Sequence, residues 1–257
     1  MTALDLFDVS GKRVVVTGGG SGIGTMIARG FVQAGASVII ASRKEASLKE
    51  VTDELSAIGE CSYLVADLSK EDGCRGLGEA VAQRWDSLDV LVNNAGANWG
   101  VPLAEQDSAS WARVLDLNVE GVFHTTKFLL PLLKAAGTTE RPARVINIGS
   151  VDGIQVPAFE TYAYSASKAA VHQLTRHLAK HLAPEITVNA IAPGPFQSRM
   201  MKATLDAAGE GLTRMMPLRR IGRDEDMAGA AIFLASEAAS FMTGTIIPVD
   251  GGIATTR

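Results

Sequence analysis

The strongest constraint on the fold is a set of seven short apolar runs, rich in β-branched residues and separated by segments long enough for helices. The runs lie near residues 13–18, 37–42, 61–67, 89–94, 143–150, 186–193 and 245–251. Between them, apolar residues recur at spacings of three and four, as in SWARVLDLNVEGVFHTTKFLLPLLK, which is typical of amphipathic helices. This alternation of strands and helices predicts a parallel, doubly wound sheet.

The apolar runs hardly alternate with polar residues, as expected when helices cover both faces of the sheet. Hydrophobic residues make up 47% of the 257 residues, charged residues make up 20%, and no Pro/Gly/Ser-rich or charged linker interrupts the chain. We therefore expect one α/β domain of the Rossmann type over residues 1–257, with ligands at the carboxyl ends of the strands.

Composition narrows the range of partners. The formal net charge is −4, so neither nucleic acid nor an anionic membrane surface is expected as a partner. No apolar run approaches the roughly 18 to 20 residues of a membrane-spanning helix.

Cys61 and Cys74 lack metal or redox spacing, and the first residues lack the apolar core of a signal peptide, so we expect the cytoplasm as the location. His177 and His181 share a helix face but lack an HExxH glutamate, so no metal site is predicted.

A glycine-rich stretch, TGGGSGIG (17–24), follows the first strand and opens the first helix. In that context glycines let backbone N–H groups approach a pyrophosphate at a helix N-terminus. Gly18, Gly22 and Gly24 carry the spacing, although it departs from the strict G-x-G-x-x-G pattern. The alternative is a tight turn without a ligand, but five glycines are costly unless the backbone needs them. A dinucleotide site is predicted.

The residues that end the second strand predict which dinucleotide binds. Ser42 stands where an acidic residue would contact the ribose hydroxyls of NAD, and Arg43 follows it. A guanidinium would bind a 2′-phosphate that a carboxylate would repel. NADP(H) is therefore favoured and NAD(H) stays possible, because Arg43 could instead be a solvated residue at a strand end. Asp67, after the third strand, could accept from the adenine amino group or cap the next helix.

Tyr164 and Lys168, in YSASK (164–168), lie four residues apart in a stretch that reads as helix, so they can face one pocket. A phenol that exchanges a proton with a carbonyl oxygen at neutral pH needs a pKa of about 7, and that shift costs about 4 kcal/mol. An ammonium about 4 Å away, at an effective dielectric constant of about 20, supplies about 4 kcal/mol. Helped by the positive charge of an oxidised nicotinamide, Lys168 is expected to acidify Tyr164.

Two more polar residues belong to this hypothesis. Ser150 ends the fifth strand, where its hydroxyl could hold a substrate oxygen. Asn118 lies within a long apolar helix, and a buried amide needs partners. It either links through water to Lys168 as a proton path or bonds back to a helical carbonyl. Tyr162 has no lysine four residues on and is not expected to act.

Together TGGGSGIG, NNAG (93–96), NVEG (118–121), YSASK, IAPG (191–194) and MTGTIIPVDGG (242–252) resemble the short-chain dehydrogenase/reductase family, classical type, over nearly the whole chain. The resemblance implies a catalytic tetrad of Asn118, Ser150, Tyr164 and Lys168, and commonly a homotetramer. It also implies a cofactor-binding set made of Gly18, Ser21, Gly22, Ile23, Gly24, Ser42, Arg43, Asp67, Leu68, Asn94, Ala95, Gly96, Tyr164, Lys168, Pro193, Gly194, Phe196 and Ser198.

Two positions depart from common family patterns. Ser198 stands where threonine is frequent, a change that keeps the hydroxyl. Ser21 fills the place of a basic residue that NADP-preferring members usually carry, so Arg43 is left as the main discriminator. By the resemblance, the backbone after Pro193 and Gly194, around Phe196, binds the nicotinamide amide.

A narrower similarity concerns the substrate. ARVINIGSVDGI, YAYSASKAAVHQL and GTIIPVDGG are similar to 3-oxoacyl reductases linked to bacterial rhamnolipid synthesis and to fatty-acid-type 3-oxoacyl-acyl-carrier-protein reductases. This implies NADPH-dependent reduction of a 3-oxoacyl thioester or related ketone, with Tyr164 as general acid/base. The alternatives are a reductase or dehydrogenase of a sugar, polyol, steroid or xenobiotic ketone, and a sensor that holds NADP without turnover.

Residues 196–218 occupy the place of the family's substrate lid. The flexible side chains of Met200, Met201, Met215 and Met216 suit closure over an apolar chain, or else they pack helices. Trp99 either lines the same cleft or anchors an exposed loop. The basic residues near the lid could dock an acidic acyl carrier protein or form a solvated rim; they are Arg199, Lys202, Arg214, Arg219 and Arg220.

Overall fold

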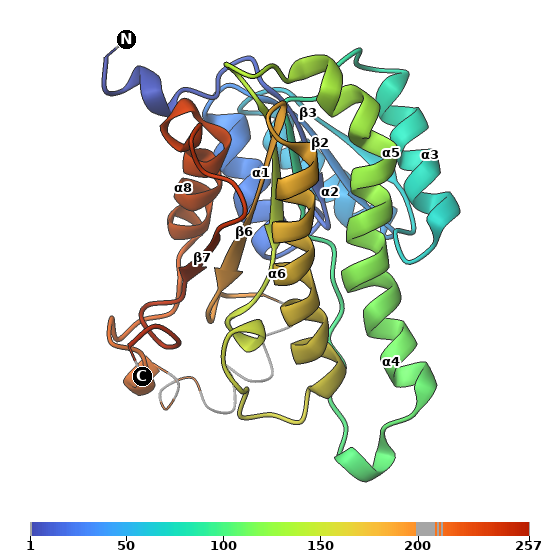
Figure 1. The fold of residues 1–257 in the computed structure, drawn as a ribbon, viewed down its shortest axis with the longest axis vertical. Coiled ribbons are helices and arrows are strands. Elements are labelled where there is room, and N and C mark those ends of the chain that lie inside the picture. The colour runs from blue at the N-terminus through green and yellow to red at the C-terminus, as the bar shows by residue number, and fades with distance from the viewer. Residues whose placement is uncertain (1, 199–208, 210, 212, 257) are drawn as a thin grey trace.

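The centre of the fold is a seven-stranded sheet, which a computed structural model places in the order β3-β2-β1-β4-β5-β6-β7 (Figure 1). The described residues are 2–198, 209, 211 and 213–256. Every neighbouring pair of strands is parallel. The predicted doubly wound sheet is confirmed, and its strands are β1 (Arg13–Thr17), β2 (Ser37–Ser42), β3 (Cys61–Val65), β4 (Val90–Asn93), β5 (Ala143–Ile148), β6 (Ile186–Pro193) and β7 (Ile246–Val249).

Helices cover both faces of this sheet, as Figure 1 shows. One apolar cluster joins the sheet to α1, α2 and α8, and a second joins it to α3, α5 and α6. Within the described residues, none of the helices is long and apolar enough to cross a lipid bilayer. The helices are α1 (Ile23–Gln33), α2 (Glu45–Ser56), α3 (Glu71–Ala82), α4 (Ser108–Leu115), α5 (Gly121–Ala136), α6 (Tyr162–Leu182) and α8 (Asp224–Ala235).

The strands are apolar on both sides because consecutive side chains enter different clusters. Val14 and Val16 of β1 belong to the cluster beside α1, whereas Val15 lies in the cluster beside α3 and α5. All three side chains are 0% exposed. A strand of this kind has no solvated face, so its sequence shows no polar alternation.

The topology sets one place for a ligand. The central strand β1 pairs with β2 on one side and with β4 on the other, so the order of the chain reverses there. In open α/β sheets, the loops at the carboxyl ends of the strands on either side of this point form a crevice that binds ligands.

The long helix predicted around residue 118 is interrupted. α4 ends at Leu115, a π-helical turn covers Asp116–Glu120, and α5 begins at Gly121. A Cβ at Gly121 would lie 2.5 Å from the carbonyl oxygen of Leu68, so this junction passes against the chain that follows β3. Apolar periodicity alone did not reveal the interruption, because the three segments continue one apolar face.

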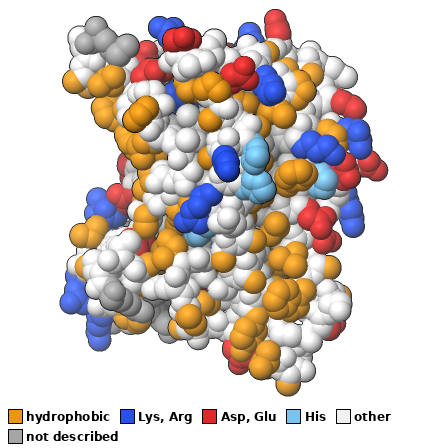
Figure 2. Space-filling model, viewed as in Figure 1, with side chains coloured by type: hydrophobic (Ala, Val, Ile, Leu, Met, Phe, Trp, Pro, Cys, Tyr) orange, Lys and Arg blue, Asp and Glu red, His pale blue; other side chains and the backbone are white. Residues whose placement is uncertain are grey.

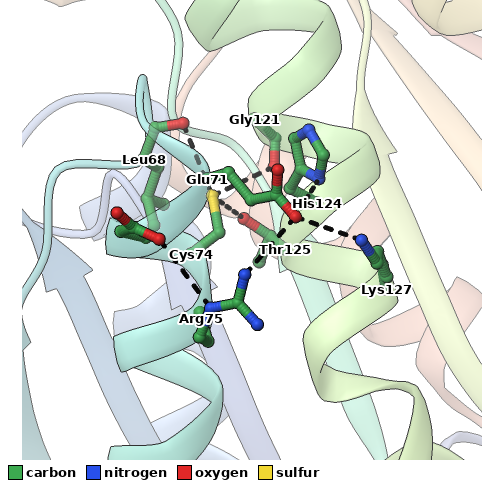
Figure 3. A network of polar contacts seen from close by, with 9 residues as sticks. Leu68, Glu71, Cys74, Arg75, Gly121, His124, Thr125 and Lys127 are labelled. Carbon is green, nitrogen blue, oxygen red and sulfur yellow. Dashed lines mark hydrogen bonds and ion pairs between the residues drawn. The ribbon is translucent and has the colours of Figure 1, made fainter.

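A polar network joins α3 to α5 (Figure 3). The carboxylate of Glu71 accepts a hydrogen bond from Nζ of Lys127 at 3.1 Å and lies 3.6 Å from the Arg75 guanidinium. Nδ1 of His124 lies 3.8 Å from the same carboxylate. These charges lower the pKa of Glu71, the hydrogen bond from Lys127 most of all.

The thiol of Cys74 belongs to this junction (Figure 3). It donates toward the carbonyl oxygens of Leu68 at 3.6 Å and Gly121 at 3.9 Å, and it accepts from the hydroxyl of Thr125 at 3.5 Å. Burial raises the pKa of Cys74, so the sulfur stays protonated. Its role is to hold α3 against the start of α5, next to the π-helical turn.

Candidate active site

The loops that follow the parallel strands leave the sheet at one edge. Nearly all residues predicted for the site lie on these loops or on α6, and the structure brings them to this edge. The glycine turn follows β1, Arg43 follows β2, Asp67 follows β3, the Asn94–Gly96 segment follows β4, Ser150 follows β5 and Gly194 follows β6.

The glycine turn has no room for side chains. Gly18 and Gly22 have positive φ values of 67° and 57°. A Cβ at Gly18 would lie 2.9 Å from Cα of Ala95, and one at Gly24 would lie 2.3 Å from the carbonyl oxygen of Gly18. Gly22 immediately precedes α1, so free backbone N–H groups at the start of that helix border the turn, with Ile23 as its first residue.

Side chains from β1 and the loop after β4 support this turn. The hydroxyl of Thr17 accepts hydrogen bonds from the backbone N–H groups of Asn94 at 2.9 Å and Ala95 at 3.0 Å. The side-chain amide of Asn94 donates to the carbonyl oxygens of Thr17 at 2.9 Å and Gly18 at 3.2 Å. Thr17 was not among the predicted residues, although it directly precedes the first glycine.

Arg43 and Asp67 meet at the ends of β2 and β3. Nε of Arg43 lies 3.8 Å from Oδ1 of Asp67, and the Arg43 side chain is 59% exposed. Asp67 accepts from the N–H of Ser69 at 3.1 Å and from its hydroxyl at 2.7 Å. Burial pushes the pKa of Asp67 upward, but the Ser69 hydrogen bonds and the Arg43 charge outweigh it and lower the pKa.

Asp67 does not cap α3, because the N-cap position of that helix is Lys70. That alternative from the sequence is therefore wrong, and Asp67 instead forms a local turn with Ser69. The Ser42 hydroxyl accepts a hydrogen bond from the N–H of Lys44 at 3.3 Å. It also lies against the glycine turn, since a Cβ at Gly20 would be 3.5 Å from the Ser42 oxygen.

Asn118 lies in the π-helical turn and is 1% exposed. Its Oδ1 accepts from the N–H of Ala97 at 2.8 Å, and its Nδ2 donates to the carbonyl oxygen of Ala97 at 2.9 Å and to the Ser167 hydroxyl at 2.9 Å. The side chain therefore does not bond back to its own helix. π-helical turns recur at functional sites, and this one fixes the loop after β4 to α6.

Tyr164 and Lys168 lie on the same side of α6, as their spacing predicted. Nζ of Lys168 lies 5.5 Å from the centre of the Tyr164 ring and donates to the carbonyl oxygen of Ile148 at 2.8 Å. Lys168 is 5% exposed. A Cβ at Gly96 would lie 3.3 Å from Oδ1 of Asn118 and 3.7 Å from this Nζ, so both groups border the loop after β4.

Ser150 completes the group. It is 7% exposed, and its side chain lies close enough to Tyr164 to lower the pKa of the phenol. Its Oγ also accepts from the N–H of Asp152 at 3.1 Å. The hydroxyl of Ser165 donates to the carbonyl oxygen of Asp152 at 2.7 Å, so the turn after β5 is fixed to α6 one residue from Tyr164.

The electrostatics of this pocket differ from the expectation. Burial raises the pKa of Tyr164 to about 12, the Asp152 charge adds to the increase, and the Ser150 hydrogen bond only partly opposes it. Burial likewise lowers the pKa of Lys168 to about 8. The protein's own groups therefore do not bring the Tyr164 pKa to 7. The spacing correctly placed the two groups together, but it could not reveal the cost of taking both out of water.

His172 lies one helical turn beyond Lys168 and is 4% exposed. A Cβ at Gly149 would be 2.2 Å from its Nε2, and one at Gly153 would be 2.9 Å from its Cε1. The ring thus fills the space behind the Ser150 turn. Burial lowers the pKa of His172 to about 4, and the Lys168 charge lowers it further, so the imidazole is neutral.

The segment after β6 approaches the glycine turn. Ser198 lies against Gly22, where a Cβ would be 3.1 Å from the serine Cβ. Gly194 allows close passage, since a Cβ there would be 2.7 Å from Cα of Asp250. Phe196 is 2% exposed, and its ring leaves no space for a side chain at Gly222. Pro193 ends β6.

The predicted lid is only partly covered by the described residues. Met200 and Met201, like Arg199 and Lys202, lie outside them. Met215 is 55% exposed, whereas Met216 is 1% exposed and packs in a small cluster with Val151 and Ile253. Met216 is therefore buried among residues of turns, whereas the notion of a lid or of packed helices stays a prediction for the other methionines.

Trp99 and the described arginines have identifiable contacts. The Trp99 ring, 39% exposed, lies under the Arg113 guanidinium of α4 at 4.1 Å. Arg220 makes two hydrogen bonds to Asp226, and Arg219 donates to the carbonyl oxygen of Arg214. Arg220 is thus paired with Asp226 within the chain, and its side chain is 37% exposed.

The two histidines that share a face of α6 have ring centres 4.8 Å apart. Among residues 2–198, 209, 211 and 213–256, no group of three or more metal-binding side chains is placed to hold an ion. Ser21 is exposed, and Leu68 is buried with its carbonyl oxygen toward Cys74.

Sequence reasoning missed four residues that shape the pocket, namely Thr17, Asp152, Ser167 and His172. Each lies within a few positions of a sequence motif, but the motif assigns no task to it. Asp152 and His172 matter through contacts that only the fold creates. Ser167 receives the Asn118 hydrogen bond and donates to the carbonyl oxygen of Tyr164 at 2.7 Å.

The residues present fit a dinucleotide with a 2′-phosphate. The closed turn at Gly18 and Gly24 exposes backbone where a side chain would block a pyrophosphate. Arg43 is exposed at the end of β2, and no acidic residue occupies the Ser42 position. The loop after β4 links this turn to the catalytic group, since a Cβ at Gly18 would be 2.9 Å from Cα of Ala95 and one at Gly96 would be 3.7 Å from Nζ of Lys168.

Comparison with known proteins supports this geometry. A family model described as enoyl-(acyl carrier protein) reductase matches residues 18–254. The chain is 48% identical over 249 residues to a Pseudomonas aeruginosa rhamnolipids biosynthesis 3-oxoacyl-acyl-carrier-protein reductase, covering 96% of this chain and 97% of that protein. It is 37% identical over 252 residues to a galactitol 2-dehydrogenase (L-tagatose-forming) of Cereibacter sphaeroides, covering 96% of each chain.

A solved structure gives the same result. The Pseudomonas aeruginosa RhlG/NADP active-site complex superposes with a TM-score of 0.94 at 46% identity, covering 97% of this chain and 99% of that one. At these identities the fold and the family are shared over the whole length.

Proposed function

This chain belongs to the short-chain dehydrogenase/reductase family, and from that premise we propose that it is an NADPH-dependent reductase of 3-oxoacyl thioesters or related ketones. The observation that carries the reaction is the buried group formed by Ser150, Tyr164 and Lys168 beside the glycine turn. Bound NADPH would supply a hydride to a carbonyl carbon. The rest of the chemistry falls to side chains of this chain.

Tyr164 is the proposed proton donor. Because burial raises its pKa to about 12, the phenol is protonated at neutral pH and can give its proton to a forming alkoxide. The Ser150 hydroxyl would hold the carbonyl oxygen beside the phenol and donate to it. In the reverse reaction the same oxygen would accept the proton of the alcohol.

Lys168 and Asn118 are the proposed supports of that donor. The Lys168 ammonium, beside the Tyr164 ring, would stabilise the phenolate left after proton transfer. Asn118 would hold the loop after β4 and, through Ser167, the first turn of α6. A water between Asn118 and Lys168 is the proposed route by which Tyr164 regains a proton.

NADP(H) is proposed as the cofactor, because Arg43 offers a guanidinium to a 2′-phosphate. The other contacts proposed for it are the glycine turn, the Asn94–Gly96 loop, Asp67, and the backbone from Pro193 to Phe196 with Ser198. The support is the fit of the Gly18 and Gly24 positions, together with the similarity to RhlG, whose solved structure is a complex with NADP.

Two similarities to known proteins bear on the choice of substrate. The 48% identity to a 3-oxoacyl-acyl-carrier-protein reductase favours an acyl thioester, with an acyl carrier protein as its proposed carrier in the cell, and the 37% identity to a galactitol 2-dehydrogenase keeps a polyol ketone as the second candidate. The test follows the absorbance of NADPH and NADH with the acetoacetyl thioester of N-acetylcysteamine and with L-tagatose. Faster turnover of the thioester with NADPH is expected; turnover of tagatose alone would favour the polyol reaction, and cofactor binding without any turnover would favour a sensor.

A homotetramer in the cytoplasm is also proposed. Figure 2 shows apolar side chains gathered over the α4 region of one face, where Leu103, Trp111 and Phe123 are exposed, and Phe241 is exposed beyond α8. Cys61 and Cys74 are both free thiols, which suits a reducing compartment. Light scattering after size-exclusion chromatography measures the mass, and a monomer would contradict the assembly.

A further inference from the structure

Asp152 places a carboxylate beside Ser150, Tyr164 and Lys168, and the chemistry proposed above gives it no task. Its backbone is fixed on two sides, since its N–H donates to Oγ of Ser150 at 3.1 Å and its carbonyl oxygen accepts from Oγ of Ser165 at 2.7 Å. The side chain therefore starts from a position that is set relative to the reacting groups.

The Asp152 carboxylate has no hydrogen bond and no ion pair within the described part of the chain, although the residue is only partly exposed. Carboxylates that are fully buried are almost always paired, whereas Asp152 lies between buried and exposed. Its charge nevertheless acts on the pocket, because it raises the pKa of both Tyr164 and Lys168. The chain thus keeps a carboxylate that has no protein partner among the described residues close to the place where a carbonyl would bind.

Lys168 offsets this charge only in part, because burial raises the pKa of Asp152 and outweighs the lowering by the Lys168 charge. Its ammonium is 5% exposed and donates to the carbonyl oxygen of Ile148 at 2.8 Å. The remaining charged or titratable side chains near it are Tyr164, a protonated phenol, and the neutral His172. Asp152 is therefore more exposed to solvent than Lys168.

We propose that Asp152 is a specificity-determining residue that excludes ketones carrying a negative charge near the carbonyl, so that the site accepts neutral 3-oxo esters and thioesters and rejects free 3-oxo acids. The proposal rests on the proposed function, in which the ketone oxygen of a 3-oxoacyl substrate lies at Ser150 and Tyr164. The carboxyl carbon of the ester, thioester or acid is then only two bonds from the ketone carbon. Like charges in a partly desolvated pocket repel strongly, and rejection by an unfavourable charge is a common source of specificity.

The test compares methyl acetoacetate with acetoacetate, which share a skeleton and differ in charge. For the wild-type protein with NADPH, kcat/KM for the ester should exceed that for the acid by more than about tenfold. Added salt should raise kcat/KM for acetoacetate by screening the repulsion, with little effect on the ester. In Asp152→Asn, kcat/KM for acetoacetate should rise by about tenfold, and its increase with salt should disappear.

A gain of activity on the acid separates specificity from structural damage, because a misfolded pocket would lose both substrates together. Asp152→Ser serves as a second variant if Asp152→Asn does not fold. Glu160→Gln is the matched control, since Glu160 is exposed and already accepts from Tyr162 at 2.9 Å and from the N–H of Leu103 at 2.8 Å; it should keep the wild-type ratio.

The outcomes separate the two proposals. If the ester is reduced but the ratio of ester to acid is the same in wild type and both Asp152 variants, the inference about Asp152 is wrong and the reductase function stands. If neither the ester nor the thioester is reduced with either cofactor, the proposed function fails and takes this inference with it.

Discussion

Nζ of Lys168 lies 5.5 Å from the centre of the Tyr164 ring while it donates a 2.8 Å hydrogen bond to the carbonyl oxygen of Ile148. The lysine is therefore anchored to the end of β5, the strand that Ser150 follows. This anchoring fixes the ammonium relative to both hydroxyl groups of the pocket. Burial of all three groups makes the phenol a protonated donor at neutral pH rather than a ready base.

Replacing Tyr164 with Phe removes the proposed proton donor and leaves the ring in place. Turnover of the acetoacetyl thioester should fall by about 10²- to 10⁴-fold, the usual contribution of general acid catalysis. Binding of NADPH, measured by its fluorescence, should be nearly unchanged. Tyr162→Phe is the control, since Tyr162 is 39% exposed and donates to the carboxylate of Glu160 at 2.9 Å. Equal loss in both variants would mean that the wrong tyrosine was assigned.

Replacing Arg43 with Ser removes the guanidinium offered to the 2′-phosphate. A charge-assisted hydrogen bond is worth about 1.5 to 3 kcal/mol, so the KM for NADPH should rise by about ten- to a hundredfold while that for NADH changes little. Lys44→Ala is the control at the neighbouring position. Kinetics with both cofactors decide the matter, and an unaltered preference in Arg43→Ser would show that another residue selects the cofactor.

Replacing Asn118 with Ala leaves the buried N–H and carbonyl groups of Ala97 without their partner. An unsatisfied buried polar group costs about 1 to 3 kcal/mol, so the free energy of unfolding in urea should fall by about that amount. Activity should also decrease, because Ser167 loses a partner. Ser110→Ala, on the surface of α4, should have a small effect; a urea midpoint for Asn118→Ala equal to the wild type would contradict the assigned contacts.

Replacing Gly24 with Ala would place a Cβ 2.3 Å from the carbonyl oxygen of Gly18. The overlap should destabilise the fold by about 1 to 3 kcal/mol and abolish tight NADPH binding, because the turn must move. Gly229→Ala in α8 meets nothing within 4 Å and should stabilise the helix by about 0.5 to 1 kcal/mol. Thermal unfolding with and without NADPH measures both effects, and a Gly24→Ala protein that still gains stability from NADPH would rule out the proposed phosphate turn.

His172 should make the protein sensitive to acid. Burial lowers its pKa from 6.5 to about 4, so between these values the unfolded chain takes up a proton that the folded protein does not bind. Stability is therefore lost as pH falls through this window, by about 3 kcal/mol in total. In His172→Gln this loss should be absent, whereas the exposed His177→Gln should follow the wild type. Urea unfolding at several pH values between 7 and 4 provides the comparison, and parallel curves for all three proteins would be the contrary result.

Most of the fold could be predicted from local pattern. Seven apolar strands and their helices follow from the spacing of side chains along the chain, and parallel order follows from the length of the connections. The helical spacing of Tyr164 and Lys168, and the glycines at the end of β1, likewise act over a few residues. Local rules could not anticipate the π-helical turn at Asn118, which depends on Ala97 and Ser167 from two other elements.

The sequence by itself determined the doubly wound sheet, the edge at which its motifs meet and the residues found at that edge. All three follow from short-range patterns along the chain and from the steric limits of the backbone. Only the tertiary structure decided the charge state of the pocket. The pKa values of Tyr164 and Lys168 are set by burial and by Asp152, and that of His172 by burial and by the Lys168 and Arg176 charges. The loss of water around a side chain depends on every element packed against it.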